Sequence, residues 1–393
     1  MFKENPWKVQ ILLDQNILHP GQKLSGNVIL DLERPLNCNR IEVQLFGSAR
    51  VFFVEKISKP GALIQSKSYE QQIILVNETK SVFDDGSKPQ TEITWEEIAR
   101  KVSPTAIRLP TETGSQIKAG KHEFKFEFDL PAAGLYTSFD AKGSAGYVRY
   151  YILVKCYNGT AVIRRQKHLF PVVVPKVLTL QPDSQITVDE MKKTSKGVVM
   201  TKIQLTKTNF LPGEAVKGVI TINNNTSVSV KKALLYINQE TICYSLKPEV
   251  QFRESYYNTP GMGLPEPKIT AGKSLQYPIR FNVPALVPNL NISGCIQMQY
   301  HLNLDVGFDR EIHKNPLIQL KIPIEIGTHI TADAPPAYDC LDTNLGDAPP
   351  SYQESISGLT EALEAEFSSQ YNPVCYFYSN RGFEKEENEK KNE

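Results

Sequence analysis

Two copies of one short sequence near the end of the chain carry side chains suited to binding a partner. The pattern D-A-P-P-x-Y occupies residues 333–338 and again residues 347–352. Consecutive prolines hold the backbone near polyproline II, which makes no internal hydrogen bonds and fits aromatic grooves. A tyrosine two residues after the second proline can fill a neighbouring pocket and offer its hydroxyl group to a polar partner. This chemistry is recognition rather than catalysis.

A WW domain presents the aromatic groove that such a segment fits. The residues predicted to bind it are Pro335, Pro336, Tyr338, Pro349, Pro350 and Tyr352. The linker between the two motifs, 339–348, is expected to span roughly 15–20 Å. After one motif has bound, the second therefore meets a neighbouring WW domain at an effective concentration of about millimolar. A proline-rich linker with incidental tyrosines is the alternative interpretation.

Short strands with alternating character precede these motifs. The segment 122–131, "HEFKFEFDLP", alternates three phenylalanines with charged residues, and 147–156, "YVRYYILVKC", alternates in the same way. Side chains alternate faces along a strand, so each segment is predicted to lie in a sheet with one buried face. Many such runs separated by turn signals favour an all-β sandwich.

The strands follow one plan twice. "LHPGQKLSGNVIL" (18–30) resembles "FLPGEAVKGVITI" (210–222), and each Pro-Gly pair suits a tight type II turn. "IKAGKHEFKFEFDLP" (117–131) resembles "ITAGKSLQYPIRFNVP" (269–284). The first copy carries an insert at 84–116, in which the spacing of Thr94 to Glu97 predicts the start of a short helix. We therefore predict a duplicated sandwich domain.

Bulk properties exclude several function classes. The formal net charge of +1 gives no global attraction to nucleic acid. No apolar run is long enough to span a bilayer, and the start shows no secretory signal, so the expected location is the cytosol. The six cysteines form no C-x-x-C pair, which predicts reduced thiols and no metal site. Hydrolase, metalloprotease and phosphate-loop motifs are missing, so we expect neither an enzyme nor a cofactor.

The chain resembles the arrestin-domain-containing proteins, the α-arrestins. The resemblance rests on the two repeats, "GYVRYYILVKC" (146–156), "IPIEIGT" (322–328) and the two PPxY motifs behind them, and it covers essentially the whole chain. It implies two tandem immunoglobulin-like arrestin β-sandwiches at 1–175 and 180–328, followed by a largely disordered tail at 329–393. Proteins of this family are adaptors that bring HECT-type ubiquitin ligases to membrane proteins and promote ubiquitination, endocytosis and sorting. One branch forms a mixed disulfide with thioredoxin, although Cys243 and Cys295 here read more simply as buried apolar residues.

The resemblance also gives a basic cluster a role, because basic residues of the first domain receive phosphorylated cargo tails in arrestin-like proteins. The candidates are Lys142, Arg149, Lys155, Arg164 and Lys167. Arginine suits phosphate because its guanidinium fork donates two hydrogen bonds. Arg164 and Arg165 are neighbours on one strand and point to opposite faces, so at most one of them lines a given patch. An ordinary solvated strand face is the alternative.

These observations predict a cytoplasmic adaptor recruited to the plasma membrane and endosomes. Its expected partners are WW-domain HECT ligases and cytoplasmic segments of membrane receptors or transporters, with peripheral membrane association and no nucleic acid. One alternative is a structural coat component of endosomal sorting that recruits no ligase. Another is an enzyme with a divergent site.

Overall fold

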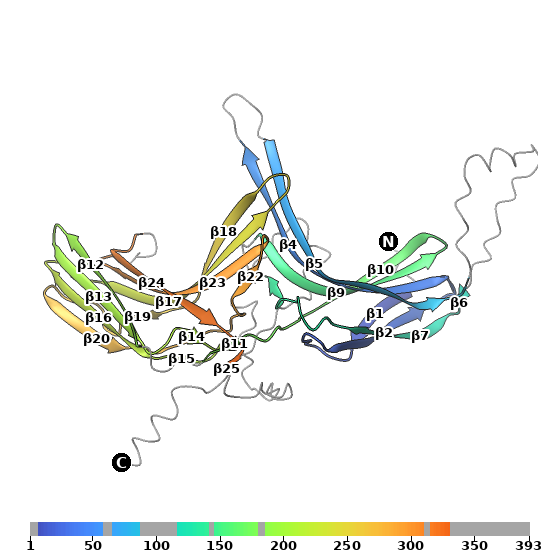
Figure 1. Ribbon diagram of the computed structural model, residues 1–393, viewed down its shortest axis with the longest axis horizontal. Helices are drawn as coiled ribbons and strands as arrows, with labels where there is room; N and C mark the ends of the chain where they lie inside the picture. Colours follow the sequence, from blue (N-terminus) through green and yellow to red (C-terminus); the bar gives the residue numbers. More distant parts are fainter. Residues whose placement is uncertain are drawn as a thin grey trace, which may run out of the picture. The chain divides into compact units, whose positions relative to one another are not determined.

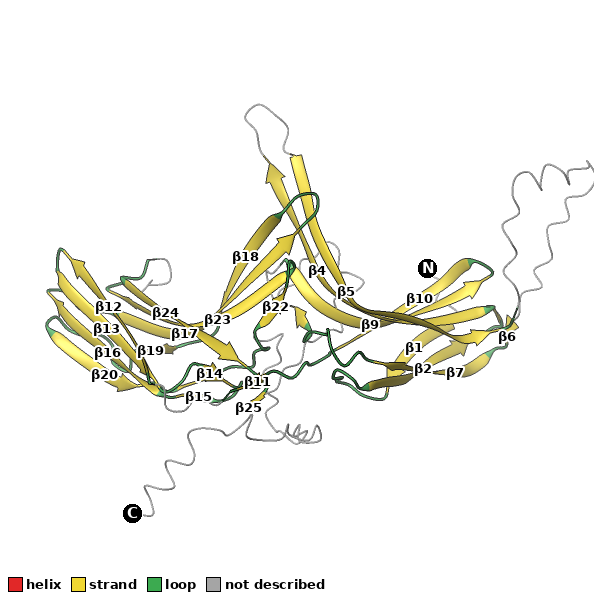
Figure 2. Ribbon diagram, in the orientation of Figure 1, coloured by secondary structure: helices red, strands yellow, loops and turns green. Residues whose placement is uncertain are grey.

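The computed structural model describes residues 7–57, 65–86, 116–140, 145–179, 185–309 and 315–330. In these ranges the chain forms β-strands joined by turns, and no helix is present (Figure 2). The described part accordingly offers no helix with the length and apolar character to cross a membrane. The predicted all-β class is confirmed. The predicted helix in the insert and the predicted C-terminal tail from residue 331 onward, with its PPxY motifs, lie outside the described residues, whereas residues 329–330 of that predicted tail form a strand.

The chain divides into two compact units (Figure 1). The first contains Met1–Ser48, Ile74–Leu135 and Arg149–Val172, and the second contains Ala49–Ile73, Tyr136–Val148 and Val173–Glu393. The units therefore do not follow a single cut in the sequence, because β4 (Arg40–Ile57), β5 (Gln65–Asp84) and β9 (Gly146–Asn158) each give residues to both.

The first unit holds a sandwich, called here the first sandwich. One sheet has the order β1-β2-β7, formed by β1 (Trp7–Leu13), β2 (Lys23–Leu32) and β7 (Gly120–Asp129). The other has the order β10-β9-β4-β5, with β10 (Ala161–Phe170) at its edge and β8 (Phe139–Asp140) paired to β9. The short strands β3 (Leu36–Asn37) and β6 (Gln116–Ile117) pair with each other.

Alternation along the strands builds the core of the first sandwich. On β9 the even-numbered residues from Val148 to Cys156 are buried, whereas most odd-numbered residues are partly exposed. Phe126 and Phe128 of β7 are likewise buried between charged neighbours. The predicted one-sided burial of both segments is confirmed. The residues on the other face of the β10-β9-β4-β5 sheet, called here its outer face, are mostly only partly buried.

The second unit holds the second sandwich. Its four-stranded sheet has the order β12 (Ile186–Thr194), β13 (Gly197–Leu205), β16 (Gly218–Thr226) and β20 (Lys273–Pro278). Its seven-stranded sheet runs β14 (Asn209–Phe210), β24 (Ile318–Ile326), β23 (Ile296–Gly307), β17 (Lys232–Ser245) and β18 (Gln251–Asn258), with β19 (Met262–Gly263) and β22 (Leu290–Ile292) attached. The pairs β15 (Ala215–Val216) with β21 (Phe281–Asn282), and β11 (Val177–Leu178) with β25 (His329–Ile330), complete it.

The two copies of the repeat make the same local structure. Gly21 and Gly213 have φ angles of 77° and 88°, and the chain closes each turn with a hydrogen bond, from Gln22 N to His19 O and from Glu214 N to Leu211 O. A positive φ at the third turn position after proline defines the type II turn. The predicted turns are confirmed.

The same turn then anchors the second repeated element in each copy. Leu130 N donates to Gln22 O at 2.9 Å, and Val283 N donates to Glu214 O at 2.9 Å. Gly26 and Gly218, the lone glycines of the repeat, each lie where a Cβ would overlap a carbonyl oxygen of the neighbouring strand. The internal duplication read from the sequence is therefore a duplication of structure.

Candidate functional site

The six predicted WW-binding residues all lie outside the described residues. The structure places part of the predicted basic cluster on the outer face of the β10-β9-β4-β5 sheet. Arg165 pairs with Lys155 across β9 and β10, and Lys167 pairs with Leu153, so these three basic side chains share one face. We call Lys155, Arg165 and Lys167 the basic face.

Two stacked aromatic rings lie next to the basic face. The Lys167 ammonium group lies 4.2 Å from the centre of the Tyr151 ring, and that ring stacks on Phe46 at 5.1 Å. Lys155 Nζ donates to Gln44 Oε1 at 3.2 Å. A cation–π contact thus positions the Lys167 ammonium group, and a neutral amide positions that of Lys155.

The other predicted basic residues lie elsewhere. The pairing of β9 with β10 shifts between Val162 and Arg164, and the shift places Arg164 opposite the buried Cys156. The Arg164 guanidinium then lies 5.5 Å from the centre of the Trp7 ring. Arg149 is only 6% exposed, and Lys142 lies outside the described residues. Of the five predicted residues the structure brings Lys155 and Lys167 together, and it adds Arg165.

A second polar surface lies on the outer face of the seven-stranded sheet. Alternate residues of β17, β23 and β24 face this side, and neighbouring strands bring them into register. We call this set the polar face: Tyr236, Asn238, Glu240, Gln299, His301, Asn303, Asp305, Gln319 and Lys321. Most of these side chains on β17 and β23 are buried, so both faces of the two central strands are shielded from water.

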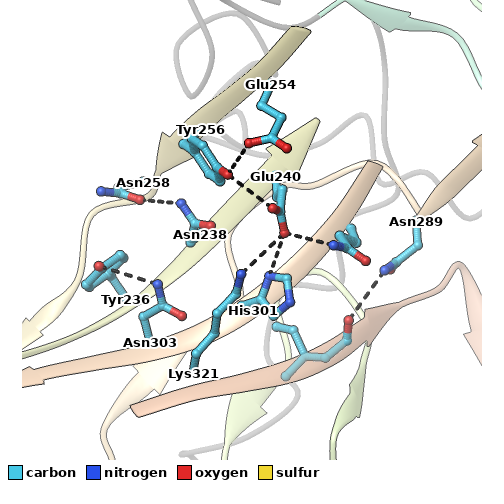
Figure 3. A network of polar contacts seen from close by, with 12 residues as sticks. Tyr236, Asn238, Glu240, Glu254, Tyr256, Asn258, Asn289, His301, Asn303 and Lys321 are labelled. Carbon is cyan, nitrogen blue, oxygen red and sulfur yellow. Dashed lines mark hydrogen bonds and ion pairs between the residues drawn. The ribbon is translucent and has the colours of Figure 1, made fainter. Parts of the chain in front are cut away.

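Glu240 is the centre of the polar face (Figure 3). Its Oε2 atom accepts a hydrogen bond from Gln299 Nε2 at 2.8 Å and lies 3.4 Å from Lys321 Nζ and 3.7 Å from His301 Nδ1. Its Oε1 atom accepts from the Tyr256 hydroxyl of β18 at 3.3 Å. Four side chains from three neighbouring strands thus converge on one carboxylate.

The electrostatic balance of this cluster keeps Glu240 charged and His301 neutral. Burial opposes ionisation of Glu240, but the Gln299 hydrogen bond and the Lys321 charge outweigh it and hold the pKa of Glu240 below its usual value. Burial lowers the pKa of His301, and Lys321 lowers it further, against the opposing effect of Glu240. At neutral pH the cluster therefore contains one carboxylate, one ammonium group and an uncharged imidazole.

A second carboxylate, that of Asp305, lies on β23 four residues after His301. Asp305 is 1% exposed; its Oδ2 accepts from the Tyr236 hydroxyl at 3.0 Å and its Oδ1 from Gln319 Nε2 at 2.9 Å. Asn303 Nδ2 donates to the same Tyr236 hydroxyl at 3.4 Å. Sequence reasoning missed the polar face. The sequence does contain a sign of it, because Gln299, His301, Asn303 and Asp305 alternate with apolar residues along 296–306. This alternation predicts that the four polar side chains share one face of the strand, but it does not predict that they are buried.

The described residues contain no group of three or more His, Cys, Asp or Glu side chains that could hold a metal ion. Cys38, Cys156, Cys243 and Cys295 are buried cysteines that form no disulfide among the described residues. Burial raises the pKa of Cys295 to about 12, which keeps this thiol protonated and poorly nucleophilic at neutral pH.

Comparison with known proteins places both sandwiches in a family. Residues 9–179 match the model "Arrestin (or S-antigen), N-terminal domain", and residues 195–330 match "Arrestin (or S-antigen), C-terminal domain". The chain is 25% identical to Protein ttm-2 of Caenorhabditis elegans over 337 residues, covering 81% of this chain and 88% of that protein. It is also 25% identical to human arrestin domain-containing protein 5 over 249 residues, 62% of this chain and 61% of that protein. With mouse arrestin domain-containing protein 4 it shares 24% identity over 54% of this chain and 50% of that protein.

Proposed function

Because this chain belongs to the arrestin-domain-containing family, the α-arrestins, and is a trafficking adaptor in general terms, we propose that it links membrane-protein cargo to WW-domain HECT ubiquitin ligases. The observation that carries the proposal is the pair of D-A-P-P-x-Y motifs at 333–338 and 347–352, placed directly after two arrestin domains. In this account the ligase performs the chemistry, and the adaptor raises the local concentration of ligase at the cargo. Ubiquitination, endocytosis and sorting of the cargo follow.

The duplication of the motif supports a ligase with several WW domains. Binding of one motif holds the other near a second WW domain, so the combined affinity exceeds that of either motif by a factor of about 10² to 10⁴. Tyr338 and Tyr352 act in this complex without phosphate, because a charged phosphate group would not fit an aromatic pocket.

The basic face supports the other half of the proposal, contact with cargo. Arg165, Lys155 and Lys167 share one side of the sheet, where the Tyr151 ring lies beside Lys167 and the Gln44 amide beside Lys155. A phosphorylated or acidic cytoplasmic segment of a receptor or transporter is the ligand that such a face suits. We place the protein in the cytoplasm, with peripheral recruitment to the plasma membrane and endosomes.

The second candidate, a coat component that recruits no ligase, shares the sandwiches but has no need of the tail. We also infer that the chain catalyses no reaction itself, in keeping with a family of adaptors. Deleting 331–393 distinguishes adaptor from coat, because only the coat retains trafficking activity without the tail. A turnover screen on the full chain addresses the enzyme alternative.

Affinity purification from cells tests the proposal. The wild-type chain is compared with the double variant Tyr338→Ala, Tyr352→Ala. We expect ligases to disappear from the variant sample, while cargo proteins remain in both. Recovery of the same ligases in equal amounts with both chains would refute recruitment through the tail.

A further inference from the structure

The polar face contains hydrogen-bond acceptors that no donor among the described residues fills. Tyr236 has one hydroxyl proton, which it donates to Asp305, so the Asn303 amide must face Tyr236 with its NH₂ group. The Asn303 Oδ1 atom then points away from Tyr236, and it is buried without a hydrogen-bond partner although the residue is only 5% exposed. An unfilled acceptor at this depth is unfavourable in the free protein. The Asn303 Oδ1 atom is therefore a position where a hydrogen-bond donor of a ligand can bind.

The Asp305 carboxylate, next to Asn303, has acceptor positions that its hydrogen bonds do not occupy. A carboxylate offers about four acceptor positions, and the hydrogen bonds from Tyr236 and Gln319 occupy two. Asp305 and Asn303 lie two residues apart on β23 and therefore face the same side. An amide oxygen next to an ionised carboxylate is a pair of acceptors suited to a donor-rich cation, a guanidinium or ammonium group.

The charge of the polar face points the same way. The nine residues of the polar face include two carboxylates, Glu240 and Asp305, and one ammonium group, Lys321, while the lowered pKa of His301 leaves the imidazole uncharged at neutral pH. Within this set, negative charge therefore exceeds positive charge by one.

Lys321 shows how a cation reaches this surface. It begins on β24 opposite Asn303, yet its ammonium group lies 3.4 Å from Glu240 on β17. The side chain thus extends over β23 from Asn303 toward Glu240 (Figure 3). Because this side chain is 45% exposed, it can move aside at little cost and open the surface beside Asn303.

We propose that the polar face of the second sandwich binds a lysine or arginine side chain of a basic polypeptide segment, held by Asp305 and Asn303 beside Lys321. The inference rests on the proposed function, which brings the protein to cytoplasmic segments of membrane proteins. Those segments are enriched in Lys and Arg close to the membrane. The two sandwiches then bind segments of opposite charge: acidic or phosphorylated segments bind the basic face, and basic segments bind the polar face.

Fluorescence polarisation with the full chain tests this proposal. The probe is a labelled peptide in which arginine alternates with serine, and the matched peptide carries uncharged citrulline in place of arginine. We expect only the arginine peptide to bind. Asp305→Asn should weaken it about tenfold or more, as expected for loss of a charged hydrogen-bond partner. Lys321→Gln should tighten it about threefold, because it removes a like charge from the site. Asp189→Asn on the exposed edge strand β12 is the matched control and should change nothing.

The two active variants act in opposite directions, which a loss of folding does not mimic. If Asp305→Asn melts at a lower temperature than wild type, only the binding result for Lys321→Gln is used to judge the proposal, since the Lys321 side chain is about half exposed. Equal binding of the two peptides, or weaker binding by Lys321→Gln, would overturn the proposal. A tandem WW fragment titrated into the same samples reports separately on ligase recruitment, so each idea can fail without the other.

Discussion

Replacing Glu240 by alanine tests whether the polar face is a connected network. Glu240 is 8% exposed and accepts from Gln299, Tyr256 and Lys321. Breaking a buried ion pair from one side typically costs 3–5 kcal/mol. Tyr256 and Lys321 are substantially exposed and regain water once Glu240 is gone, so the loss belongs below that range, at about 2–3 kcal/mol. For a unit of this size, that corresponds to a drop of roughly 5–10 °C in the melting temperature.

Scanning calorimetry of the full chain measures this change, and Glu254→Ala is the matched control. Glu254 lies on the neighbouring strand β18 and is exposed; its Oε2 lies 2.8 Å from the same Tyr256 hydroxyl, which shares its single proton between Glu254 and Glu240. Its replacement should lower stability by no more than about 0.5 kcal/mol. Equal losses for the two variants, or a gain of stability in Glu240→Ala, would refute the reasoning. A cycle with Lys321→Gln should give a coupling energy of no more than about 1 kcal/mol, because one partner is half exposed.

Three further predictions follow from the same structure. The lowered pKa of His301 means that the unfolded chain binds more protons than the folded chain near and below pH 6.5, so the free energy of unfolding should fall as the pH drops from 7.5 to 5.5. His301→Gln should reduce the slope of unfolding free energy against pH by at most about 1.4 kcal/mol per pH unit. An unchanged slope in urea titrations would contradict this prediction. Reversing the basic face to Glu at Lys155, Arg165 and Lys167 should abolish binding of a phosphorylated peptide in polarisation assays, whereas a loss of less than twofold would rule out this face. Gly218→Ala should cost about 1–3 kcal/mol because its Cβ overlaps the Gln204 carbonyl, while Gly263→Ala, which meets nothing within 4 Å, should cost almost nothing by calorimetry.

The sequence predicted those parts of the fold that depend on local chemistry. Pro-Gly pairs constrain the backbone directly, so the turns at Gly21 and Gly213 could be placed from residue type alone. Alternation along 122–131 and 147–156 likewise predicted most of the buried side chains. The repeat order then implied two sandwiches without any knowledge of how distant strands pair.

Features that depend on pairing between strands could not be predicted. Arg164 and Arg165 are equivalent in sequence, and only the shift in the pairing of β9 with β10 decides that Arg165 joins Lys155. Arg149 belongs to the face of β9 that alternation marks as open, but the structure buries it. The polar face depends on Lys321 reaching across β23 to Glu240, a contact between residues 81 positions apart. None of these contacts leaves a trace in local composition.

The affinity of the full chain for a tandem WW fragment of a HECT ligase tests the central claim most directly. The account predicts tight binding by the wild type and a loss of about a hundredfold or more when either Tyr338 or Tyr352 is changed to alanine, because the linked second contact disappears. It predicts no measurable binding when both are changed. A double variant that binds the fragment with wild-type affinity would contradict the account.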